Sequence, residues 1–230
     1  MKLLAFETAT EACSVALYID GEVSERFEIA PKQHTQLVLP WAEQLLAEAG
    51  IGKSQLDAIA VGIGPGAFTG VRLAVALVQG IALALDKPVL PISTLAALAM
   101  QGADQKTGRI LAAIDARMGE IYCAEFRLEE DGLVVAAGEE TLIAPEAFSS
   151  EFSGSIIGVG TGFSASNAVL ETNLKSRLIV CRADALPHAA DVARLATRDY
   201  LSDNMMAADV LEPAYLRNKV ALTLKEQGKS

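Results

Sequence analysis

Short apolar runs separated by turn residues mark the beginning of the chain. Three such runs predict consecutive β-strands, at residues 2–8, 12–20 and 22–30. The Asp20-Gly21 pair between the second and the third run is a strong hairpin signal. Because a doubly wound fold would alternate strands and helices from its start, this opening hairpin predicts a mixed sheet in an α/β protein.

A helical period replaces the strand pattern over residues 31–50. Apolar side chains recur there every four residues, which predicts a helix with one apolar stripe. The stripe consists of Leu37, Trp41, Leu45 and Ala49. Gly50 is placed to end the helix. Pro40 either marks the true start of the helix or kinks it, because proline lacks the amide hydrogen.

The next predicted helix is apolar almost all round. Residues 56–64 predict a buried strand that leads through the glycine-rich loop GIGPGAFTG into this helix. From residue 71 to residue 85, all positions except Arg72, Gln79 and Gly80 are apolar. A surface helix needs only about a third of its circumference apolar. We therefore expect something to cover the other side of this helix, either another helix of the chain or a second protein.

The strand pattern restarts near residue 100, after a strand at 87–94 and a short helix at 94–102. Further strands are predicted at 109–127 (two strands around a turn), 129–143 and 156–162, and a helix at 184–203. The inner positions expected for this helix include Ala190, Ala193, Leu195, Ala196 and Leu201. We therefore predict an N-terminal lobe of residues 1–100 and a C-terminal lobe of residues 101–230, with the tail 208–230 packing back on the first lobe.

Charge and composition limit the classes of partner and cofactor. The 230 residues carry a formal net charge of −10, so the chain alone should bind nucleic acid poorly and would need a partner to contact RNA. The three cysteines form no CxxC pair and the two histidines have no ligand-spaced neighbour, which argues against a metal site. No segment reads as a signal peptide or a membrane span, so we expect a cytoplasmic protein.

The glycine-rich loop does not match a known phosphate-binding motif well. No lysine follows its glycines, which excludes a Walker loop, and Pro65 removes an amide that a dinucleotide fingerprint would need. Backbone amides at a helix start remain a generic anion site, so a weak nucleotide or anion contact stays open. That contact would involve Glu7, Thr8, Thr10, Gly64 and Gly66. A tight turn that needs the dihedral angles of glycine explains each glycine better than anion binding does, and the threonines either donate to a phosphate or satisfy the turn.

Five segments in this order resemble the bacterial TsaB (YeaZ) family: FETATEACSVAL, HTQLVLP, GIGPGAFTGVRLAVALVQGIAL, IDARMGEIY and EPAYLRN. The resemblance covers essentially residues 1–220, and the GPGxFTGxR segment is its most specific part. It implies a two-lobed, actin-like fold of the sugar kinase/actin/Hsp70 (ASKHA) class. It also implies a role in making threonylcarbamoyladenosine beside the anticodon of tRNAs that read ANN codons.

The resemblance further implies a non-catalytic subunit that forms a heterodimer with the catalytic subunit TsaD, which an ATPase subunit, TsaE, joins. tRNA would be reached indirectly through that complex, and the chain alone could form a homodimer through the same face. The helices carried over as contact helices span residues 35–49 and 69–85. Within them the expected partner-binding residues are Leu37, Trp41, Leu45, Val71, Arg72, Val75 and Gln79.

No catalytic residue, metal or cofactor is expected in the isolated chain, and ATP or ADP is expected only in the complex. Many members of the family have aspartate where this chain has Glu7, which weakens conventional Mg-nucleotide binding here. The alternative from another class is a nucleotide-dependent ATPase or small-molecule kinase of the same superfamily. A peptidase finds no support, because neither GxSxG nor a local Cys–His signature is present.

Overall fold

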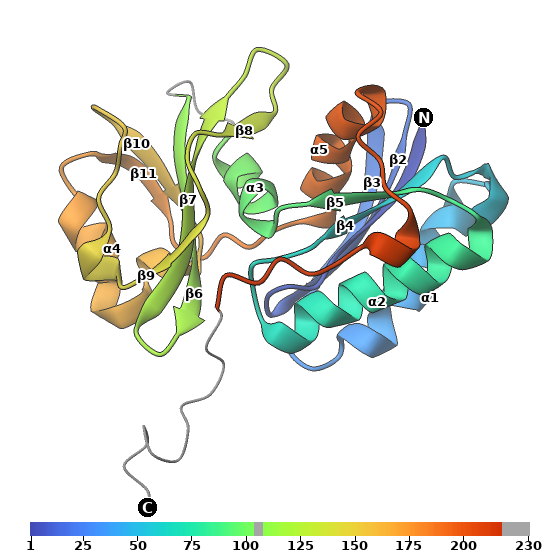
Figure 1. Ribbon diagram of the computed structural model, residues 1–230, viewed down its shortest axis with the longest axis horizontal. Coiled ribbons are helices and arrows are strands. Elements are labelled where there is room, and N and C mark those ends of the chain that lie inside the picture. Colours follow the sequence, from blue (N-terminus) through green and yellow to red (C-terminus); the bar gives the residue numbers. More distant parts are fainter. Residues whose placement is uncertain (104–107, 218–230) are drawn as a thin grey trace, which may run out of the picture.

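The computed structural model describes residues 1–103 and 108–217, which form two β-sheets with helices between and around them (Figure 1). The first sheet has the strand order β3-β2-β1-β4-β5. Its strands are β1 (Lys2–Glu7), β2 (Ala12–Ile19), β3 (Glu22–Ile29), β4 (Ala58–Gly62) and β5 (Val89–Ile92). β1, β2 and β3 pair antiparallel, whereas β4 runs parallel to both β1 and β5. The predicted hairpin at Asp20-Gly21 and the mixed sheet are confirmed.

The second sheet repeats this topology, with the order β11-β10-β6-β7-β8 and β9 paired to β7. Its strands are β6 (Arg109–Arg117), β7 (Glu120–Leu128), β8 (Val134–Ala136), β9 (Thr141–Ile143), β10 (Ile156–Val159) and β11 (Leu178–Arg182). The prediction of one strand over 129–143 is wrong. β8 pairs with the end of β7 and β9 with its start, and the ladder is interrupted between them.

Two long helices cover the outer face of the first sheet: α1 (His34–Glu48) and α2 (Phe68–Leu85). Side chains of β1 alternate between faces, so Leu4 and Phe6 contact these helices while Leu3 and Ala5 face the other lobe. α1 begins at His34 and continues through Pro40, so the proline lies inside the helix and does not mark its start.

Two other helices, α3 (Thr94–Ala99) and α5 (Ala189–Leu201), lie between the sheets (Figure 1). Small side chains allow this close packing, because alanines of the first sheet such as Ala5 and Ala60 face the apolar side of α5. α5 therefore packs on the first sheet, although a division at residue 100 assigns it to the second lobe. Leu201 was expected on the inner side of this helix, and that expectation is wrong. It ends the helix with 78% of its surface exposed.

The outer face of the second sheet carries less helix. α4 (Ala165–Leu174) covers part of it, through a small core that contains Leu111, Phe163 and Leu170. Neither α4 nor β11 was predicted from the sequence. Short 3-10 helices lie at Lys53–Gln55, Met100–Gly102, Pro145–Ala147, Thr161–Phe163 and Ala208–Val210.

Candidate functional site: a helical face and an interlobe cleft

The outward side of α2 is apolar and exposed. The exposed positions on the side away from the sheet recur along the helix: Thr69, Arg72, Ala76, Gly80, Leu83 and Ala84. Leu83 exposes 64% of its surface and lies beside the exposed Gly80 and Ala84 on the same side of the helix. The helix therefore has one side in the core and another, also largely apolar, in solvent.

By length and composition α2 could also cross a membrane, the one helix of the described residues for which this holds. Its mean hydropathy is 1.8 over 18 residues, of which 28% are buried. A single helix of this kind is weak evidence for a membrane, since helices of soluble proteins meet the same criterion. Here the helix packs against β4 and β1 of the first sheet.

α1 adds a second exposed apolar surface beside α2. Leu39 is 46% exposed and Trp41 is half-buried. A small cavity of about 60 Å³ lies between the two helices, lined by Leu39 and Leu46 of α1 and by Ile81 and Leu85 of α2. We call the outward surface the α1–α2 face. It is defined by Leu39, Trp41, Ala76, Gly80, Leu83 and Ala84.

The structure corrects three of the predicted partner-binding residues. Leu45, Val71 and Val75 expose 1%, 3% and 4% of their surface, because they point into the core beneath the helices. The periodicity of an all-round apolar helix does not tell which side faces the sheet, and the same ambiguity hid Leu39 and Leu83.

Four predicted residues keep an exposed or half-exposed position. Leu37, Trp41 and Gln79 are half-buried and Arg72 is exposed. Arg72 lies 3.3 Å above the ring of Phe68, and its Nε donates a hydrogen bond to the Tyr215 hydroxyl. Their contact with a partner stays a prediction.

A cleft of about 970 Å³ separates the lobes on the side away from α3 and α5. The first lobe lines it with Thr10, His34 and Gly66, and the second lobe with Asp115 and Thr161. The His34 Nε2 lies 3.1 and 3.0 Å from the carbonyl oxygens of residues 10 and 12. Because both partners are acceptors, this nitrogen carries the hydrogen and donates it.

Glu7 does not face the cleft, which corrects its predicted role as a nucleotide contact. Only 1% of its surface is exposed, and its carboxylate accepts hydrogen bonds from the Ala9 amide at 2.6 Å and the Thr94 hydroxyl at 3.0 Å. Burial raises the pKa of Glu7 to about 7 even though these donors oppose the shift. A Cβ on Gly62 would lie 1.9 Å from Oε2, so that glycine makes room for the carboxyl group.

The other predicted anion contacts divide into two groups. Thr10 and Gly66 line the cleft. Thr8 is fully buried and donates its hydroxyl to the carbonyl of Gly70, while the Gly64 amide donates to the Thr94 hydroxyl. Thr8 and Gly64 therefore hold the loop and the start of α2 in place.

A polar cluster that the sequence did not reveal fixes the start of α5. The Ser14 hydroxyl donates to Glu25 Oε1 at 2.6 Å, and His188 Nδ1 lies 2.9 Å from Oε2. Burial would raise the pKa of Glu25, but the hydrogen bonds that it accepts hold it below its usual value. Burial opposes the charge on His188 as well, and the Glu25 carboxylate raises its pKa instead. Because the serine is bonded to glutamate and not to histidine, the cluster lacks the order of a nucleophilic triad.

In residues 1–103 and 108–217, no group of three or more His, Cys, Asp and Glu side chains is arranged to hold a metal ion. Cys13 and Cys123 are buried free thiols, whereas Cys181 is a half-buried free thiol.

Comparison with known proteins gives consistent matches over most of the chain. The model of a family described as "TsaD: tRNA N6-adenosine threonylcarbamoyltransferase" matches residues 27–224. The tRNA threonylcarbamoyladenosine biosynthesis protein TsaB of Escherichia coli is 41% identical over 96% of both chains. The protein of the same name from Haemophilus influenzae is 39% identical over 96% of this chain and 95% of its own. The solved structure of YeaZ from Pseudomonas aeruginosa superposes with a TM-score of 0.84 at 40% identity, covering 94% of this chain and 99% of that one.

Proposed function

The chain belongs to the TsaB (YeaZ) family of tRNA threonylcarbamoyladenosine biosynthesis proteins, and from this premise we propose that it acts as a non-catalytic subunit. In this role it binds a homologue of TsaD through the α1–α2 face and supports the activity of that partner. The proposal includes a cytoplasmic location and a larger complex that contains a TsaE-type ATPase.

One observation carries this proposal: the outward side of α2 is largely apolar and yet exposed. Contiguous exposed apolar surface is characteristic of sites that bind other proteins. Ala76, Gly80 and Ala84 are small residues on this surface, which let a second helix approach closely. A helix of the partner is therefore the occupant that fits best, and a second copy of the chain could take its place when the partner is absent.

Two further contacts favour a supporting role over a catalytic one. The Glu7 carboxyl is bonded to Ala9 and Thr94 within the lobe, so it is not free to hold a metal–nucleotide complex in the cleft. The Ser14 hydroxyl is bonded to Glu25. The net charge of −10 favours indirect contact with tRNA through the partner.

Reconstitution tests the proposal directly. tRNA modification is measured with the TsaD homologue, the enzyme that makes the threonylcarbamoyl donor and the TsaE homologue, with and without this chain. We expect modification only when the chain is present, and none from the chain and the donor without the TsaD homologue. Modification at full rate without the chain, or by the chain alone, would refute the proposed role.

The interlobe cleft favours one alternative, a nucleotide-dependent ATPase or kinase. Its volume of about 970 Å³ and the hydroxyls of Thr10 and Thr161 suit a small polar ligand. If this alternative is right, the isolated chain binds Mg-ATP with a micromolar dissociation constant. In our proposal, ATP or ADP binds only in the complex. Titration calorimetry of the isolated chain with Mg-ATP distinguishes the two.

A further inference from the structure

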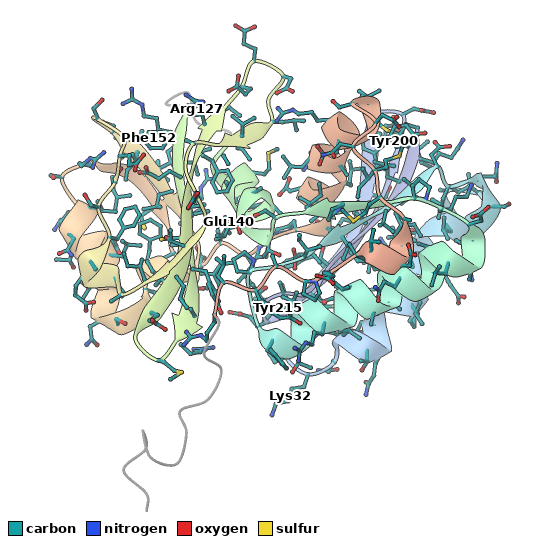
Figure 2. All side chains as sticks on the ribbon, in the orientation of Figure 1. Lys32, Arg127, Glu140, Phe152, Tyr200 and Tyr215 are labelled. Carbon is teal, nitrogen blue, oxygen red and sulfur yellow. The ribbon has the colours of Figure 1, made fainter. Side chains whose placement is uncertain are left out.

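The last described segment of the chain, residues 206–217, runs along the first lobe and ends on the second. In Figure 1 this segment passes α2 and crosses below α3 and α5 toward the base of β6. Figure 2 places Tyr215 on it between the lobes. We call this segment the strap, and its residues 214–217 line the interlobe cleft.

The strap is anchored firmly on the first lobe. Met206 pairs with Val89 at the edge of β5, and Leu211 is 2% exposed in the core under α2. The Gln79 side chain donates to the Leu211 carbonyl at 3.0 Å, and the Ala214 amide donates to the Ile63 carbonyl at 2.8 Å. Backbone pairing and buried apolar contacts together hold this part as a piece of the first lobe.

Among the described residues, Arg217 makes the polar contacts of the strap with the second lobe, and Leu216 packs against the apolar core between the lobes. Arg217 Nη2 donates to the Ala116 carbonyl at 3.0 Å, and Nη1 lies 2.8 Å from the Glu120 carboxylate. Nη1 also lies 3.4 Å from the sulfur of Met118. The three partners come from the end of β6, the turn after it and the start of β7, and this turn forms the opposite wall of the cleft. The polar attachment is therefore local, whereas the anchor on the first lobe is extensive.

The position of the other contacts between the lobes gives this attachment a mechanical role. α3 and α5 join the two sheets through a continuous apolar core on one side of the cleft. Lobes joined at one side can open at the other, as in hinged domain closure. The strap crosses that other side, where Arg217 ties the two walls together.

We propose that residues 206–217 form a clasp that sets how far the lobes open across the cleft, with the Arg217–Glu120 ion pair as its releasable end. Release leaves the strap on the first lobe and frees the β6–β7 turn. The proposal concerns the isolated chain and does not rest on the proposed function.

Spin-label distance measurements on the full chain test the clasp. Labels are placed at Gln44 on α1 and Asn173 on α4, both exposed and outside the cleft, with Cys181→Ser in the background. We expect Arg217→Ala and Glu120→Gln each to shift the distance distribution to longer values and to broaden it. The control Arg26→Ala removes an exposed ion pair to Glu48 within the first lobe and should leave the distribution unchanged.

A charge swap separates the clasp from a general loss of packing. Combining Arg217→Glu with Glu120→Arg should return the distribution toward that of the original chain, whereas Arg217→Glu alone should widen it. If Arg217→Ala does not fold, Glu120→Gln carries the test. A distribution that Glu120→Gln leaves at its original position and width would overturn the proposal.

Discussion

The two lobes share one sheet topology but differ in what covers their outer faces. Each sheet has a hairpin followed by two parallel strands in the same order. The first lobe carries α1 and α2, of 15 and 18 residues, whereas the second carries α4 of 10 residues and short 3-10 turns. The exposed positions of α4 are polar, namely Asn167, Thr172 and Asn173, whereas those of α2 include Ala76, Leu83 and Ala84.

This difference distinguishes the sheet topology, which the fold requires in both lobes, from the apolar outer surface of the first lobe, which the fold does not require. Strand pairing and the interlobe core constrain both sheets in the same way, so both keep the topology. The outer helices are not under that constraint, and an exposed apolar face gives no benefit to the folded chain by itself. The apolar surface of the first lobe is therefore best explained by a contact outside the chain.

The largest effect is expected where α2 packs against the loop that follows β1. A Cβ on Gly70 would lie 2.0 Å from the Thr8 carbonyl oxygen, and backbone cannot yield as a side chain can. Gly70→Ala should therefore lower the free energy of unfolding by about 3 kcal/mol or more. Gly80 in the same helix meets nothing within 4 Å, so Gly80→Ala should raise it by about 0.5–1 kcal/mol. Denaturant unfolding of both variants checks this, and equal effects would contradict the assigned inner and outer sides.

A second prediction concerns the carboxyl group at the end of β1. Glu7 keeps its proton in the folded chain up to a pKa of about 7, while in the unfolded chain it ionises near its ordinary value of 4.5. The folded state thus binds more protons between these values, so the free energy of unfolding falls as pH rises from 4.5 to 7, by on the order of 3 kcal/mol. Glu7→Gln should remove this decline in unfolding experiments across that range.

The Thr94 hydroxyl sharpens this prediction, because it donates to the ionised form of Glu7. Thr94→Val removes that donor and should raise the pKa of Glu7 further. The free energy of unfolding should then go on falling to a higher pH. A Glu7→Gln variant that keeps the full decline would show that another group causes it.

A smaller effect is expected where α5 joins the first sheet. His188 has a raised pKa, so its stabilising charge is present below its ordinary value of 6.5 and lost as pH rises through the raised value. Glu25 has a lowered pKa, so its contribution is present above 4.5 and lost as pH falls through the lowered value. His188→Gln should therefore cost about 1–2 kcal/mol between pH 4.5 and 6.5 and less in alkaline solution.

A double-mutant cycle with Glu25→Gln measures this pair. The coupling energy between the two positions should be largest in the same pH range and should shrink above it. A coupling that does not change with pH would contradict the ion pair.

Much of the fold follows from local patterns in the sequence. The opening hairpin, the restart of strands in the second lobe and a helix within 184–203 each depend on neighbouring residues, and the structure contains them, the helix as α5 over Ala189–Leu201. The actin-like fold class is confirmed by the repeated sheet topology and the family match. α4 escaped prediction because ten residues are too few to establish a helical period, and Ser166, Asn167 and Ala168 do not have helical backbone angles.

The candidate site was less predictable from the sequence, because it depends on which way each side chain points and on contacts between residues far apart in the chain. Periodicity could not decide whether Val75 or Leu83 faces the sheet, since both sides of α2 are apolar. Glu7 was expected to contact a nucleotide or anion, but its carboxyl group accepts a hydrogen bond from Thr94, which is 87 residues away in the chain. The His188–Glu25 pair joins residues 163 positions apart and has no local signal.

The central claim is that the α1–α2 face binds the TsaD homologue, and one pair of variants tests it most directly. Leu83 on α2 and Leu201 on α5 are both exposed leucines in helices, at 64% and 78%, so Leu83→Glu and Leu201→Glu change surface chemistry equally. Calorimetry with the purified TsaD homologue should show that Leu83→Glu weakens binding by about 3 kcal/mol, on the order of a hundredfold in Kd, because the charge would be buried unpaired. Leu201→Glu should bind as the original chain does. Equal affinities of the two variants would contradict the account.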